Sequence, residues 1–138
     1  MPSTYDSFTQ TSRLNQSQNG VAFEVLDNIP LAASGPSSQE FFDVVGASKA
    51  ELLITIGANS GGTSPTIQFF IDVIDIVSGA TIKTYNGTLI TNVNGGVDYI
   101  SIDGRSVLLG DYIQVRWTLG GSVLGTWNSV YARLVIKR

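Results

Sequence analysis

The chain contains no cysteine and no histidine among its 138 residues. Without cysteine there is no disulfide framework, no thiolate zinc site and no cysteine nucleophile. Without histidine the commonest general base and the commonest metal ligand at neutral pH are missing. These two absences predict that the protein is not an enzyme and that it binds no metal ion or other cofactor.

Charge is also scarce: 14% of the residues are charged, against about 25% in typical soluble domains. The net charge is −3 and the eight basic residues are scattered, so no basic stripe is available for phosphate contacts, which argues against a nucleic acid partner. No apolar run reaches the ~18–20 residues of a membrane span, and residues 1–19 lack the order of a signal peptide. We therefore expect synthesis and folding in a cytoplasm, with no membrane partner.

Short apolar runs that alternate with polar residues dominate the rest of the sequence. In the run 112–119, Ile113, Val115 and Trp117 fall on one face of an extended chain and Arg116 falls on the other, because successive side chains of a strand point to opposite faces. Eight to ten such runs, separated by glycine, asparagine, serine and proline, predict an all-β antiparallel sandwich. A jelly roll is the first interpretation, and an immunoglobulin-like topology is the second.

The domain organisation predicted from composition is simple. Residues 1–19 are rich in Ser, Thr, Gln and Asn and are interpreted as a polar, extended N-terminal arm. Residues 20–138 are interpreted as a single β-sandwich domain, since 43% hydrophobic residues at this length suffice for one core. Tyr5 and Phe8 are the candidate anchors by which the arm would order on a neighbouring subunit, and a disordered leader is the alternative.

Three turn signals predict particular pairings. Asn86-Gly87 is a two-residue hairpin signal and predicts that the runs at 80–85 and 88–93 pair with each other. The glycine-rich connection at 120–126 predicts a long final hairpin between the flanking runs. Pro30 has no N–H to donate and therefore predicts an edge strand or a bend.

Outward-facing residues of the predicted final hairpin are the candidate subunit interface, because aromatic and arginine side chains are enriched at interfaces. The candidates are Tyr112, Arg116, Tyr131, Arg133 and Val135. Trp127, at the start of the last run beside a loop, is the candidate for an exposed contact with a glycan or a subunit. Asp72 and Asp75 are interpreted as solvated surface charges, because a separation of three places them on opposite faces of a strand.

The stretches ITIGANSGGTSPTIQFFIDV and YIQVRWTLGGSVLGTWNSVYARLVI resemble small virion proteins of tailed bacteriophages, in particular capsid decoration or auxiliary head proteins. The resemblance covers the segment from Leu52 to Lys137. It implies an oligomeric β-sandwich in the virion that binds the phage major capsid protein and reinforces the head shell. A homotrimer is favoured, since a three-fold ring suits a capsid. The alternative is a carbohydrate- or receptor-binding module of a phage fibre or tail, an interpretation that rests on Trp127.

Overall fold

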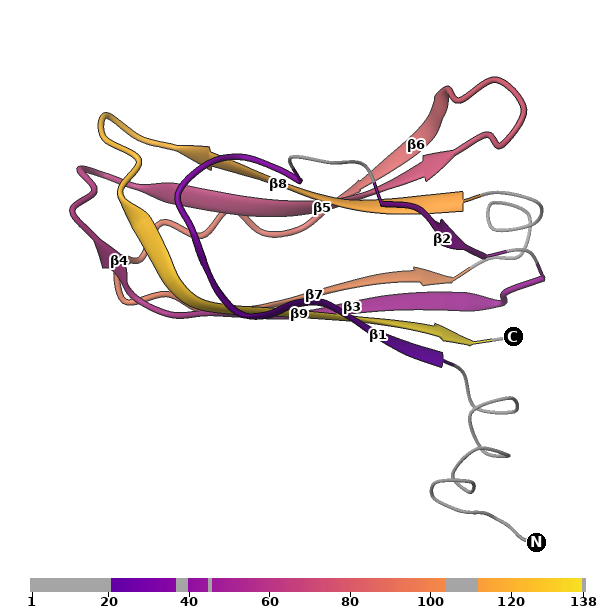
Figure 1. Ribbon diagram of the computed structural model, residues 1–138, viewed down its shortest axis with the longest axis horizontal. Coiled ribbons are helices and arrows are strands. Elements are labelled where there is room, and N and C mark those ends of the chain that lie inside the picture. The colour runs from indigo at the N-terminus through magenta and orange to yellow at the C-terminus, as the bar shows by residue number, and fades with distance from the viewer. Residues whose placement is uncertain (1–20, 37–39, 45, 104–111, 138) are drawn as a thin grey trace, which may run out of the picture.

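The predicted alternation produces strands throughout the described part of the chain, which in this computed structural model is residues 21–36, 40–44, 46–103 and 112–137. These residues contain nine strands and no helix (Figure 1). The strands are β1 (Val21–Leu31), β2 (Phe42–Asp43), β3 (Lys49–Ile56), β4 (Asn59–Ser60), β5 (Thr66–Ile74), β6 (Thr81–Asn86), β7 (Gly96–Asp103), β8 (Tyr112–Gly120) and β9 (Thr126–Lys137).

The strands lie in two facing sheets (Figure 1). Sheet A has the order β1-β9-β3-β7, and the short strand β4 also pairs with β9. Sheet B has the order β2-β8-β5-β6. Every strand pair in both sheets is antiparallel. The predicted antiparallel β-sandwich is therefore confirmed.

Strand pairing is nested along the chain. The first strand pairs with the last, β2 with β8, β3 with β7, and β5 with β6. The chain thus forms a doubled-over ribbon, and the pairs β3–β9 and β5–β8 wrap this ribbon into two sheets. Eight strands arranged in this way form a jelly roll, to which β4 is a short addition. This topology is the first of the two predicted interpretations.

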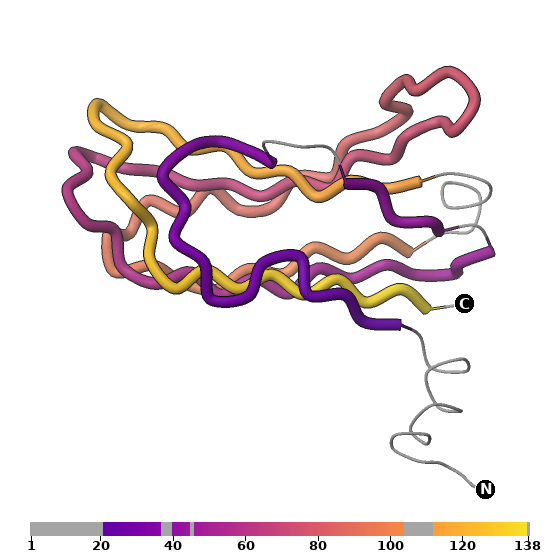
Figure 2. Tube along the Cα trace, in the orientation of Figure 1, coloured from indigo at the N-terminus to yellow at the C-terminus, as the bar shows by residue number. Residues whose placement is uncertain are grey.

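The last two strands do not form the predicted final hairpin. They follow each other in the chain, but β8 lies in sheet B and β9 lies in sheet A. Figure 2 shows the chain crossing from one layer to the other between them. Nested pairing requires this crossing, because each late strand must join the sheet that contains its early partner. The glycine-rich connection reverses the chain as predicted, but it joins two layers rather than two neighbouring strands.

The predicted hairpin at Asn86-Gly87 is also wrong. Strand β6 ends at Asn86 and pairs with β5, and residues 88–93 form no strand. The Gly87 amide donates a hydrogen bond of 2.8 Å to the carbonyl of Phe69 in β5. The next amide donates one of 2.7 Å to the carboxylate of Asp98 in β7. These bonds fasten the connection as it passes from sheet B to sheet A.

A single core fills the space between the sheets. Trp117 on β8 is buried, as its alternation predicted, and Leu134 on β9, in the other sheet, is also buried. Between the edge strands β1 of sheet A and β2 of sheet B, Phe23 contacts Phe42, with ring centroids 5.1 Å apart. Pro30 lies in β1, which is an edge strand of sheet A, so the prediction from its missing N–H is confirmed.

Gly95, just before β7, provides a test of how closely β3 and β7 must approach. Its φ is +89°, and a Cβ there would lie 2.0 Å from the carbonyl oxygen of Ile56. Gly79 has a similar φ of +76°, but a Cβ would meet no atom within 4 Å. Substitution of Gly79 by Ala should therefore cost about 1 kcal/mol of strain. Gly95→Ala should cost at least about 2 kcal/mol more, measured by urea unfolding, and equal costs would contradict the close approach.

Candidate functional site

The five predicted interface residues lie on opposite sides of the molecule. Tyr112 and Arg116 belong to β8 in sheet B, whereas Tyr131, Arg133 and Val135 belong to β9 in sheet A. The prediction that they form one surface is wrong, because it required β8 and β9 to be neighbours in one sheet. The outer faces of the two sheets therefore have different properties, and each has its own chemistry.

On sheet B the outward charges neutralise one another. The Arg116 guanidinium binds the Asp72 carboxylate through Nε and Nη2 at 2.8 and 3.1 Å. The Thr84 hydroxyl donates to the same carboxylate at 2.7 Å. The guanidinium also lies over the ring of Phe70, 4.3 Å from its centroid, a favourable cation–π geometry. Arg116 is thus held within its own chain and covers the apolar Phe70 from the outside.

Asp72 is not the solvated surface charge that its position predicted, because only 4% of the residue is exposed. Burial raises the pKa of its carboxyl, but the hydrogen bonds from Arg116 and Thr84 outweigh burial, so the net pKa lies below its usual value. A buried carboxylate is tolerated only when it is paired and hydrogen-bonded in this way. The outer face of sheet B is therefore stabilised internally by a structural ion pair.

On sheet A the outward face instead carries an exposed group of apolar side chains, called the apolar band below. Leu53 of β3 lies between Arg133 of β9 and Tyr99 of β7 in the strand register. The next row places Thr55 between Tyr131 and Val97. The exposed fractions are 46% for Leu53, 76% for Val97, 52% for Tyr99 and 41% for Tyr131. The apolar band consists of Leu53, Thr55, Val97, Tyr99 and Tyr131.

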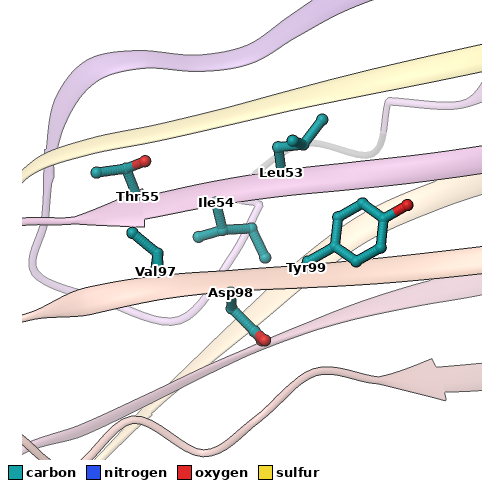
Figure 3. Close-up of a pocket in the computed structure, with 6 residues that line it drawn as sticks. All are labelled: Leu53, Ile54, Thr55, Val97, Asp98 and Tyr99. Carbon is teal, nitrogen blue, oxygen red and sulfur yellow. The ribbon is translucent and has the colours of Figure 1, made fainter.

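Two shallow depressions flank Leu53. The first is lined on its outer side by Leu53, Thr55, Val97 and Tyr99, which project from the adjacent strands β3 and β7 (Figure 3). The second lies between β3 and β9 and is lined by Leu53, Thr55, Tyr131, Arg133 and Glu24. The second depression therefore combines apolar side chains with the ion pair of Glu24 and Arg133. Both depressions present apolar side chains of β3 and a neighbouring strand at the surface.

Charged residues border the apolar band, and each ion pair is made within the chain. Arg133 Nε lies 2.9 Å from a carboxylate oxygen of Glu24. At the other border, the Glu51 carboxylate receives Lys49 Nζ at 3.0 Å and Lys137 Nζ at 3.2 Å. These bonds leave the apolar band between two groups of paired charges.

Glu51 has an unusually acidic carboxyl. The Tyr99 hydroxyl donates a hydrogen bond to it, and this bond is the main cause of its lowered pKa. The ammonium of Lys49 adds to the effect, and the pKa of Glu51 falls from 4.5 to about 2. Tyr99 thereby links the apolar band to the charged border, and its ring is held in place by its own hydroxyl.

Leu53, Val97 and Tyr99 were not among the site residues predicted from the sequence. A signal was present: Leu53 interrupts the polar side of the ELLITI alternation, and Val97 and Tyr99 do the same in VDYIS. Outward apolar residues of three strands form one surface only if those strands are neighbours in a sheet. The order β9-β3-β7 brings together segments that are far apart in the chain, and the sequence alone does not specify that order.

Trp127 is fully buried, with no exposed surface, so the prediction of an exposed contact is wrong. An extra residue in β9 is the reason. Trp127 pairs with Leu31 and Val130 pairs with Ile29, which places three steps of β9 opposite two steps of β1. Such a β-bulge changes the side to which the following residues point. Ser129 within it has a φ of 51°. The bulge allows both Trp127 and Val130 to point into the core.

Other expectations concern residues outside the described ranges or features other than this face. Tyr5 and Phe8, the predicted arm anchors, lie outside the described residues. Within the described ranges no three His, Cys, Asp or Glu residues lie together as metal ligands would. No helix in the described part of the chain is long and apolar enough to cross a membrane.

Comparison with known proteins finds a likeness at the level of the fold. No protein-family model and no curated protein sequence matches the chain. Among solved structures, the chain is similar to VP2 in the subviral particle of infectious bursal disease virus, with a TM-score of 0.54 and 9% sequence identity. The match covers 86% of this chain but 32% of the VP2 chain, so this protein spans about a third of that chain. The likeness shows a shared fold with a viral particle protein.

Trp127 should behave as a core residue. Trp127→Ala should lower the free energy of unfolding by about 3–5 kcal/mol, because it empties a large buried volume. Trp127→Phe should cost less, since most of the volume remains and the indole N–H, which has no hydrogen-bond partner among the described residues, is removed. Chemical denaturation of the two variants measures both effects. A stable Trp127→Ala protein would contradict the burial.

Glu51 should contribute to acid stability. A carboxyl with a lowered folded-state pKa stabilises the fold fully above its unfolded pKa of 4.5 and loses this contribution as the pH falls toward 2. Glu51→Gln should therefore flatten the fall in unfolding free energy across that pH window. Tyr99→Phe removes the main cause of the lowered pKa and should have an intermediate effect. Denaturation curves at several pH values test this, and parallel curves for all three proteins would refute it.

Proposed function

We propose that this protein is a non-enzymatic structural component of a virion, and specifically a homo-oligomeric capsid decoration protein that binds and stabilises a phage head shell. The observation that carries the proposal is the uncovered apolar band on a jelly roll whose core is already complete. Because a fold by itself does not define a function, the surface is needed as well as the topology. A folded domain with an exposed apolar sheet face is suited to association.

Several features support a structural role over catalysis. The sequence lacks both cysteine and histidine. The buried carboxylate of Asp72 is fully engaged by Arg116 and Thr84, and Glu51 is engaged by two lysines and Tyr99. Carboxylates that are paired and held at low pKa are poor general bases at neutral pH. The charged groups of the two outer faces therefore serve stability and surface shape in this proposal.

The more specific role in head decoration rests on the resemblance of the segment 52–137 to tailed-phage head proteins. The fold shared with the VP2 chain supports a place in a viral shell. The partner in this proposal is the major capsid protein, and the location is the virion. A three-fold ring of copies would match one symmetry of an icosahedral head.

The glycan- or receptor-binding alternative loses the residue on which it rested. Trp127 is buried in the core and cannot stack on a sugar without unfolding of the strand start. The exposed aromatic residues of the apolar band, Tyr99 and Tyr131, lie on a sheet face rather than in a loop-lined cleft. A broad sheet face suits protein contact better than capture of a small sugar.

The proposed function predicts binding to head shells. Purified protein mixed with empty heads, assembled from the major capsid protein encoded with this chain, should co-sediment with them and raise their melting temperature. Heads assembled from an unrelated capsid protein are the control and should not bind. Absence of co-sedimentation with the cognate heads, with no change in melting temperature, would refute the decoration role.

A further inference from the structure

We propose that the apolar band on sheet A is the surface through which two copies of this chain pair face to face across a two-fold axis. The inference deepens the proposed function and rests on it in one respect, namely that the protein acts as an oligomer. It specifies which face is used and which partner occupies it. The occupant is a second copy of the chain, and four features of the face support this choice.

The shape of the face is self-complementary. Leu53 projects from the central strand β3 and is 46% exposed, and a depression lies on each side of it. A surface with a central apolar projection between two shallow depressions can receive a copy of itself. A two-fold contact requires this property, because the same patch must supply both sides.

The strand register indicates a suitable position for the two-fold axis. One row of the face contains Arg133, Leu53 and Tyr99, and the next row contains Tyr131, Thr55 and Val97. The two-fold axis lies in the plane of the contact, runs perpendicular to the strands and passes between these two rows. Each row of one copy then faces the other row of the second copy. Leu53 then packs on the second copy's Thr55 position, and Tyr99 packs on its Val97 position.

The same axis gives Arg133 a favourable contact. In the register described above, its guanidinium faces the Tyr131 position of the second copy. Tyr131 is 41% exposed, so its ring is available on the outside of the sheet. Arginine over an aromatic ring is favourable when water is excluded, and both residue types are frequent at the energetic centres of interfaces.

Charge does not oppose the pairing. Charged side chains of both signs lie on the outward side of sheet A, with Lys49, Arg133 and Lys137 among the positive ones and Glu24, Glu51 and Asp103 among the negative ones. The two carboxylates nearest the band, Glu24 and Glu51, are already paired within the chain. Burial against a second copy would therefore leave neither of these two carboxylates without a partner, which is the main cost of burying charge.

The area approaches that of a specific contact. With strands about 4.8 Å apart and residues about 3.3 Å apart, four strands by seven residues cover roughly 450 Å² per copy. Two copies together would bury about 900 Å² if the face is treated as flat, without the added surface of the side chains. A specific interface buries about 1,000 Å² or more. The outer face of sheet B offers less, because Arg116 already covers Phe70 there.

The pairing makes a prediction about mass. A pair of copies is the smallest assembly that contains this contact. A three-fold ring built through other surfaces is compatible with it, and such an assembly contains six copies. Sedimentation of the purified full-length protein should therefore give the mass of two or six chains, and the mass of one or three chains would overturn the inference.

The decisive variant is Leu53→Glu, which places an unpaired carboxylate at the centre of the contact. We expect the dissociation constant of the pair to rise at least about 30-fold, so that two chains become one or six chains become three. Val97→Glu changes a more exposed residue, at 76%, and should weaken pairing with the fold retained. Circular dichroism and thermal unfolding of both variants establish that they are folded.

Two full-length controls separate this surface from other occupants. Ile82→Glu alters a similarly exposed aliphatic residue, at 56%, on the edge strand β6 of sheet B, and should leave the mass unchanged. The double variant Tyr5→Ser, Phe8→Ser alters the predicted arm anchors and should also leave it unchanged. Dissociation of either control, with a folded Leu53→Glu protein of unchanged mass, would overturn the assignment of this face.

The test distinguishes failure of this inference from failure of the proposed function. Mass in solution is measured without head shells, and shell binding is measured separately by co-sedimentation. If Leu53→Glu dissociates the pair, the face is supported whether or not the wild-type protein binds heads. If the wild-type protein binds heads but Leu53→Glu does not change its mass in solution, decoration stands and the face-to-face pair is refuted.

Discussion

The nested antiparallel pairing of the chain is the constraint on which the rest of the structure depends. Strand β9 illustrates it, because β1, β3 and the short β4 all form hydrogen-bonded ladders with this one strand. Once β9 occupies the centre of sheet A, β8 must lie in the other sheet with its own partner β2. Backbone groups that are buried must be paired, so the positions of core, loops and surfaces all follow from these ladders.

The two outer faces then differ for a chemical reason. On sheet B, the bidentate pair of Arg116 with Asp72 satisfies a buried carboxylate and places a guanidinium over Phe70. On sheet A, the ion pairs lie at the borders, and the central strand presents Leu53 without a covering side chain. One face is therefore complete within a single chain, while the other has apolar surface available for association. This asymmetry connects the fold to the proposed role in assembly.

The fold class and many buried positions were predictable from the sequence because they depend on local alternation. Val115 and Leu134 are buried as their alternation indicated, and Pro30 lies in an edge strand because it cannot donate to a ladder. The candidate site was predictable only in part. Tyr131 and Arg133 lie on the apolar face or its border, but their predicted neighbour Arg116 lies on the opposite side of the sandwich.

The sequence by itself determined which residues are extended, where the chain reverses, and which side of each strand is apolar, since these follow from residues close together in the chain. Tertiary structure alone decided which strands are neighbours. Asn86-Gly87 has the chemistry of a tight hairpin, yet it begins a connection between sheets, because β6 is already paired with β5. Trp127 is buried because of one extra residue in β9. Long-range pairing outweighs local preference here, since each ladder involves many hydrogen bonds and buried side chains, and a turn only a few.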